Sequence, residues 1–117
     1  MSCQSLAVEE HIIGDYYVVA TDLENEKQLS YATGTGGYIG ITPACTFAIA
    51  YNDRYIVVKQ HPNLDNTTIV NYYIHERQNV KATQLKTDVE GPLYEEVYER
   101  KKPQLEKYGL LEFKNVD

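Results

Sequence analysis

Large and small side chains alternate most regularly between residues 45 and 60, in the run CTFAIAYNDRYIVVKQ. The large apolar residues of its first half occupy every second position, at Phe47, Ile49 and Tyr51. Asn52-Asp53 tolerates the left-handed backbone of a tight turn, and a second β-prone run follows at residues 55–58. The segment therefore predicts an antiparallel hairpin, and its two largely apolar faces indicate a place at the centre of a sheet.

Patterns typical of strands recur on both sides of this hairpin. They cover residues 11–22, interrupted by Gly14-Asp15, and residues 27–32, 38–42 and 67–76. In the last of these segments, the face expected to be buried carries Val70, Tyr72 and Ile74. The other face is more polar and is expected nearer solvent, with Ile69, Asn71, Tyr73 and His75. Residues 79–88 lack a clear period and are expected to form a loop, with a short helix as the alternative.

One helix is expected near the end of the chain. Proline is favoured at the first helical position, so Gly91-Pro92 predicts where the helix begins. Apolar side chains then recur at helical spacing, at Leu93, Tyr94, Val97 and Tyr98. Pro103 removes a helical hydrogen bond and clashes with the preceding turn, so we expect a kink or break near Lys101-Lys102. Residues 110–113 are expected to form a last short strand or an extended tail on the sheet.

These elements fit one domain, because dividing 117 residues would leave pieces too small to bury separate cores. The predicted fold is α+β, with an antiparallel, meander-like, curled β-sheet of about five to seven strands and one C-terminal helix on a face. Residues 1–10 show no period and are expected to form a flexible arm, followed by a single α+β domain at residues 11–117.

Charge and composition limit the classes of partner. The formal net charge of −6 argues against nucleic-acid binding, which depends on a basic surface. No apolar run approaches the ~20 residues that a membrane-spanning helix needs. The chain has 11 tyrosines, which suit half-buried sheet faces and are also enriched at binding surfaces. We expect most tyrosines to be structural and the partner to be a protein.

Cys3 and Cys45 are too few for a disulfide framework. Cys45 stands at a predicted strand start and is expected to be a small buried residue. Cys3 is followed by a short polar stretch, as in a bacterial lipoprotein whose mature chain begins with a lipidated cysteine. Cys3 is therefore a candidate lipid-attachment site, which predicts a location at the cell envelope or facing the periplasm. A cytoplasmic protein with an ordinary cysteine near its start is the alternative.

Three segments together resemble a family of small uncharacterised bacterial domains of unknown function, often predicted to be lipoproteins. The segments are Gly14-Asp15-Tyr16-Tyr17, the run AIAYND at 48–53 with His61-Pro62, and Gly91-Pro92-Leu93 before an acidic helix. The resemblance covers most of residues 14–113, and Pro103 departs from the uninterrupted helix expected there. It implies a bacterial origin and an envelope location, and it brings no activity and no site residues.

Residue types that carry chemistry are sparse. The three histidines, His11, His61 and His75, lack the spacing of a metal site, and no CxxC, HxxxH or HExxH motif occurs. No catalytic residue, metal or cofactor is therefore predicted. Cys45 pairs with a histidine as a nucleophile only if the fold brings the two together. The glycine-rich run Gly34–Gly40 lacks the spacing of a phosphate-binding loop and is expected to be a flexible hairpin loop.

Three functions remain open at this point. The leading hypothesis is a non-enzymatic bacterial envelope domain of lipoprotein type that acts by protein interaction, through a surface that includes Tyr73, His75 and His61. The second is a cytosolic acidic inhibitor or immunity-type protein that neutralises a basic partner, which the net charge of −6 favours. The third is a small ligand-binding domain or enzyme with a cleft near Gly34–Gly40. The oligomeric state does not follow from the sequence.

Overall fold

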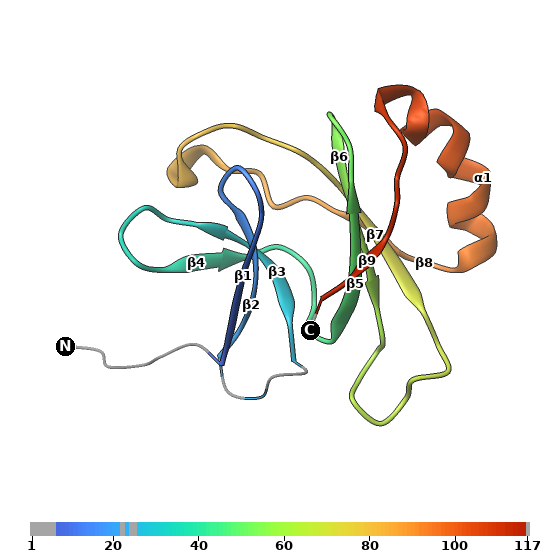
Figure 1. Cartoon of the computed structure of the whole chain (residues 1–117), viewed down its shortest axis with the longest axis horizontal. Helices are drawn as coiled ribbons and strands as arrows, with labels where there is room; N and C mark the ends of the chain where they lie inside the picture. The colour runs from blue at the N-terminus through green and yellow to red at the C-terminus, as the bar shows by residue number, and fades with distance from the viewer. Residues whose placement is uncertain (1–6, 22, 24–25, 117) are drawn as a thin grey trace.

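The computed structural model of this chain describes residues 7–21, 23 and 26–116. Two antiparallel sheets stand side by side, and one helix covers the far side of the second sheet (Figure 1). The first sheet contains β1 Val8–Ile13, β2 Tyr16–Ala20, β3 Gln28–Ala32 and β4 Tyr38–Gly40, in that order. The second has the order β8-β7-β6-β5-β9, with β5 Thr46–Tyr51, β6 Tyr55–Gln60, β7 Asn71–Glu76, β8 Glu90–Leu93 and β9 Lys114–Asn115. The helices are α1 Glu95–Leu105 and two short 3-10 turns, η1 Ala82–Gln84 and η2 Glu106–Tyr108.

The predicted class is confirmed: the fold is α+β, with antiparallel meanders and one C-terminal α-helix. The strands of the described residues are more numerous than expected and form two sheets of four and five strands. The change of sheet occurs between β4 and β5. Pro43 lies in this connection and has no N–H to continue a ladder, so the chain leaves the first sheet there.

The hairpin predicted at residues 45–60 is confirmed as β5 and β6, and β6 is the middle strand of its sheet. Ile49 lies opposite Val58, and Ala50 lies opposite Val57. Ile49 and Val58 belong to the core between the two sheets, whereas Ala50 and Val57 belong to the core under the helix. Both faces of the hairpin are therefore buried, which is why both of its faces are apolar.

The core between the sheets is built from large side chains of both. The first sheet contributes Tyr16, Val18, Leu29 and Tyr31, and the second contributes Ile49, Ile56, Val58 and Tyr73. On the opposite face of the second sheet, α1 places Tyr98 and Leu105 over Tyr72 and Ile74. The rings of Tyr72 and Tyr98 stack with centroids 4.5 Å apart, so the helix is held by direct aromatic packing.

Several predicted boundaries were wrong. Strand β1 begins at Val8 and pairs with β2, so the end of the expected arm at residues 1–10 belongs to the first sheet. Pro92 lies in β8, and α1 begins three residues later, at Glu95. An edge strand accepts proline because its outer N–H groups need no partner, and β8 is such an edge. The last short strand is Lys114–Asn115 rather than residues 110–113.

Pro103 neither breaks nor ends the helix, since α1 continues to Leu105 and then tightens into η2. Pro103 is exposed, so a carbonyl that loses its N–H partner in the preceding turn can be hydrated. In the segment 79–88, the short-helix alternative is found, as η1.

Candidate functional sites

The structure corrects the expected exposure of Tyr73 and His75. Their side chains point between the two sheets, where Tyr73 is 7% exposed and His75 is 1% exposed. The polar face predicted for β7 is therefore an interior face. The His75 side chain of this face contacts the ring of Tyr16 in the first sheet and is hydrogen-bonded to its hydroxyl. Neither residue is available to a partner.

His75 has both ring nitrogens hydrogen-bonded inside the protein. Its Nδ1 lies 2.9 Å from the carbonyl oxygen of Asp88, so Nδ1 carries the hydrogen and donates. Its Nε2 then accepts a hydrogen bond from the hydroxyl of Tyr16, at 2.9 Å. Burial lowers the pKa of His75, although the Asp88 carbonyl and the Asp88 and Glu76 carboxylates act in the opposite direction. We interpret His75 as a neutral structural group that ties the sheets together.

His61 lies elsewhere, at the far end of the second sheet from His75. His75 is paired with Ile56 near the start of β6, whereas His61 follows the end of β6, so the two histidines do not converge. The imidazole of His61 stacks on Phe47, with ring centroids 4.2 Å apart. Its Nδ1 lies 3.0 Å from the carbonyl oxygen of Ile69. His61 is thus half-buried and fixed in orientation.

A hollow of about 140 Å³ lies beside His61, and we call it the His61 hollow. It is lined by Lys27, Cys45, Thr46, Phe47, His61, Asn63, Leu64, Thr67 and Val116. The fold thus places Cys45 and His61 around one hollow, which their sequence spacing did not indicate. Burial and, to a smaller extent, the Glu26 carboxylate raise the pKa of the Cys45 thiol. A raised pKa keeps the thiol protonated, which opposes its use as a nucleophile.

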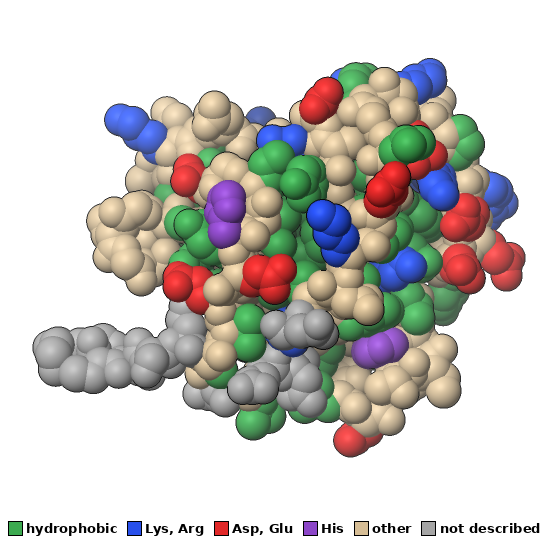
Figure 2. Space-filling model, viewed as in Figure 1, with side chains coloured by type: hydrophobic (Ala, Val, Ile, Leu, Met, Phe, Trp, Pro, Cys, Tyr) green, Lys and Arg blue, Asp and Glu red, His purple; other side chains and the backbone are tan. Residues whose placement is uncertain are grey.

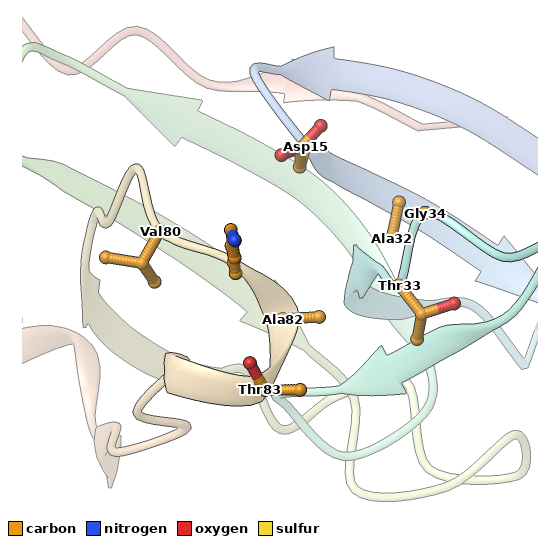
Figure 3. Close-up of a pocket in the computed structure, with 8 residues that line it drawn as sticks. Asp15, Ala32, Thr33, Gly34, Val80, Ala82 and Thr83 are labelled. Carbon is orange, nitrogen blue, oxygen red and sulfur yellow. The ribbon is translucent and has the colours of Figure 1, made fainter.

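A second hollow, of about 320 Å³, lies beside the glycine-rich loop (Figure 3). Figure 3 shows it between three segments: the β1–β2 turn with Asp15, the start of the β3–β4 loop with Thr33 and Gly34, and η1 with Ala82 and Thr83. Of the run Gly34–Gly40, where a cleft was predicted, only Gly34 lines this hollow. The hollow contains no histidine, and the side chain of Val80 points away from its centre (Figure 3). Its ionisable lining residues are Asp15 and Lys81, and both are exposed.

A third recess lies between the edges of the two sheets, and we call it the edge groove. Its volume is about 160 Å³, and its lining residues are Glu10, His11, Ile12, Ile49, Tyr51, Lys114 and Val116. They come from β1 on one side and from β5 and the C-terminal segment on the other. Figure 2 shows apolar side chains exposed along the junction of the two sheets, with charged side chains on both flanks.

The edge groove was missed at the sequence level. Tyr51 ends a strand whose other residues are almost all buried, yet it is 42% exposed. The sequence signal for this groove was Tyr51, an amphipathic residue at the end of a predicted strand. Many other tyrosines share that property, so the signal did not single out Tyr51. Because β1 and the C-terminal residues are about 100 positions apart in the chain, no local pattern brings them together.

Neither a metal site nor a membrane-spanning helix is found in the described part of the chain. Cys3 lies outside the described residues. Among residues 7–21, 23 and 26–116 there is no group of three or more His, Cys, Asp or Glu side chains arranged to hold a metal ion. None of the described helices is both long and apolar enough to cross a membrane. No family model, curated protein or solved structure matches this chain.

Proposed function

We propose that this protein is a non-enzymatic domain that acts by binding an extended segment of a partner protein in the edge groove. The observation that carries this proposal is the meeting of two sheet edges at one recess, whose lining is partly apolar and partly charged. Strand β1 ends the first sheet and β9 ends the second, with no further strand beside either among the residues that the structure describes. Residues of β1, Lys114 of β9 and Val116 just after β9 line the same groove.

An edge strand presents backbone N–H and C=O groups without partners, and an extended peptide can pair with them. Main-chain hydrogen bonds then supply affinity, and alternate side chains of the peptide enter adjacent recesses. In the edge groove, Ile12, Ile49 and Val116 provide apolar contacts for such side chains. Tyr51 adds an exposed ring, of a residue type that often dominates binding energy.

The charged residues of the groove make this edge selective. Glu9 and Glu10 in β1 are typical of charges that prevent an edge strand from pairing with any available chain. Glu10 lines one wall and Lys114 lines the other. A partner segment with a basic side chain toward Glu10 and an acidic one toward Lys114 would satisfy both. The net charge of −6 further favours a basic partner and a complex that weakens with salt.

The test is site-specific photo-crosslinking in the organism that encodes the protein. A photoreactive phenylalanine analogue replaces Tyr51 in the groove or, as the matched control, Tyr94, which is 72% exposed and precedes α1. We expect a discrete crosslinked protein from position 51 and none from position 94. Excess unmodified protein should suppress the adduct, whereas protein carrying both Glu10→Lys and Lys114→Glu should suppress it less.

Equal adducts from both positions, or an adduct that the charge-reversed competitor suppresses fully, would overturn the proposal. Attachment to the envelope through Cys3 remains a separate prediction. The intact mass of the native product tests it, since lipidation adds the mass of the acyl chains and an unmodified soluble chain contradicts it.

A further inference from the structure

The His61 hollow has features that the proposed protein-binding role does not use. The ring of His61 is held on one face by Phe47 and at Nδ1 by the carbonyl oxygen of Ile69. A carbonyl oxygen can only accept, so Nδ1 carries the hydrogen, and the neutral ring has its lone pair on Nε2. No described residue is hydrogen-bonded to Nε2. The fold therefore fixes the orientation of one acceptor on a residue that lines the hollow.

A second polar group beside this hollow lacks a partner. Thr46 lines the hollow and is 3% exposed, and its Oγ1 makes no hydrogen bond to any described residue. Buried hydroxyls nearly always have a partner, so an orphan one beside a recess needs an explanation. A ligand that places a polar atom in the hollow would give the Thr46 hydroxyl its missing partner.

The rest of the lining is mixed: Lys27, Asn63 and Thr67 are polar, and they stand beside several apolar side chains. Phe47, Leu64 and Val116 form apolar parts of the wall, and Cys45 adds a thiol. Cys45 also has a φ of +73°, in the left-handed region that residues other than glycine rarely adopt. Such strain persists only where surrounding structure enforces it, and it gathers at ligand-binding and active sites. Here the left-handed backbone lies at Cys45, directly before the start of β5.

The volume of the hollow limits the size of a ligand that it can hold. The hollow measures about 140 Å³, and an apolar protein cavity of about 150 Å³ accommodates benzene. We propose that the His61 hollow binds a phenol-sized molecule, with an apolar ring against Phe47, Leu64 and Val116 and one hydroxyl that donates to Nε2 of His61. The binding is non-covalent, because a phenol offers no electrophilic atom to the Cys45 thiol.

The hydroxyl is the feature that distinguishes this ligand class. A molecule of the same size without a donor, such as toluene, would leave Nε2 of His61 desolvated and unpaired. Losing one hydrogen bond of this kind lowers affinity by roughly fivefold to tenfold. Charge does not set the ligand class, because Lys27 lines the hollow itself whereas Glu26 and Asp65 line the adjoining recess that shares Cys45, Asn63 and Leu64.

The experiment is a titration of the isotope-labelled full chain, followed by nuclear magnetic resonance, with phenol and with toluene as the probes. We expect saturable shifts confined to residues around the hollow, with phenol binding roughly fivefold to tenfold more tightly than toluene. His61→Phe keeps the ring stacked on Phe47 but removes the acceptor, and it should abolish the preference for phenol. Leu64→Trp fills the mouth of the hollow and should abolish the binding of both probes.

A matched variant keeps the test falsifiable. Leu110→Trp changes a leucine that is 71% exposed and lies beyond the end of α1. It should bind phenol as the unmodified protein does. Linear, non-saturating shifts with both probes would mean that the hollow holds only water, and they would overturn the proposal. Equal affinity for phenol and toluene, or a preference that survives His61→Phe, would also overturn it.

Discussion

Tyr16 of the first sheet donates its hydroxyl hydrogen to Nε2 of His75 in the second sheet, across an oxygen–nitrogen distance of 2.9 Å. The same hydroxyl oxygen accepts a hydrogen bond from the backbone N–H of Gln78, also at 2.9 Å. Tyr31 makes a parallel link, donating its hydroxyl to the carbonyl oxygen of Val80 at 2.6 Å. Two tyrosines of the first sheet are therefore bonded to β7 and to the segment that follows it, in addition to the apolar contact between sheets.

The Tyr16 hydroxyl should contribute measurably to stability. Tyr16→Phe removes one oxygen and leaves both Nε2 of His75 and the N–H of Gln78 without a partner in a buried region. We expect the free energy of unfolding to fall by about 1–3 kcal/mol, as measured by chemical denaturation. Tyr17→Phe is the control, because Tyr17 lies on the outer face of the first sheet and is half-buried. Equal losses for the two variants would contradict this role.

His75 should make the protein less stable in mild acid. Burial lowers the pKa of His75 from its usual 6.5, so the unfolded chain binds a proton more readily than the folded one does. The stabilising effect is fully present above about pH 6.5, and it is lost as the pH falls toward the folded-state pKa. Protonation would place a hydrogen on Nε2 facing the Tyr16 hydroxyl, which would have to give up its own donated bond.

The measurement is the free energy of unfolding between pH 5 and 7. The unmodified protein should lose stability over this range, and His75→Leu should show a smaller slope, although it is less stable at every pH. His11→Gln, which changes an exposed histidine, should retain the slope of the unmodified protein. A variant at position 75 with an unchanged slope would refute the assignment.

Asn52 should be the most sensitive residue of the β5–β6 turn. Its Nδ2 donates to the carbonyl oxygens of Leu105 and Gly109, at 2.9 and 3.0 Å. Its Oδ1 accepts from the backbone N–H groups of Arg54 and Tyr55. One side chain therefore shapes the turn and also caps the end of α1. Asn52→Ala should cost about 2–3 kcal/mol in a denaturation experiment, whereas Asn115→Ala, at an exposed position, should cost little.

Gly91 should not tolerate a side chain. A Cβ at this position would lie 2.6 Å from the carbonyl oxygen of Tyr72 and 2.7 Å from Cδ1 of Tyr73, and φ is +148°. We expect Gly91→Ala to lower the free energy of unfolding by about 2 kcal/mol or more, because both the contact and the backbone conformation are unfavourable. At Gly37 the closest atom would be Oγ1 of Thr33 at 3.4 Å, so Gly37→Ala is the matched control. Similar stability of the two variants would show that β8 can move away from β7.

Sequence pattern was most reliable where local and tertiary requirements coincide. The β5–β6 hairpin was predicted correctly because its turn residues and its two apolar faces agree with a central place in the sheet. The helix was located but its start was not, since Pro92 suits both a first helical turn and an edge strand. The two faces of β7 were distinguished correctly, and the burial of Tyr72 and Ile74 is confirmed, but the face with Tyr73 and His75 was wrongly placed near solvent. Tyr and His are common near solvent, and it is the hydrogen bonds of His75 to Tyr16 and to the carbonyl oxygen of Asp88 that make the burial of this histidine favourable.

The sequence by itself determined the class of this protein: an α+β fold with antiparallel strands and a C-terminal helix, of acidic net charge. Those properties follow from periodicity, turn residues and composition, which act over a few neighbouring positions. The division into two sheets, the burial of His75, the hollow shared by Cys45 and His61, and the groove between β1 and the C-terminal residues were decided by the tertiary structure. Each depends on contacts between segments far apart in the chain, and such contacts are set by the packing of whole sheets.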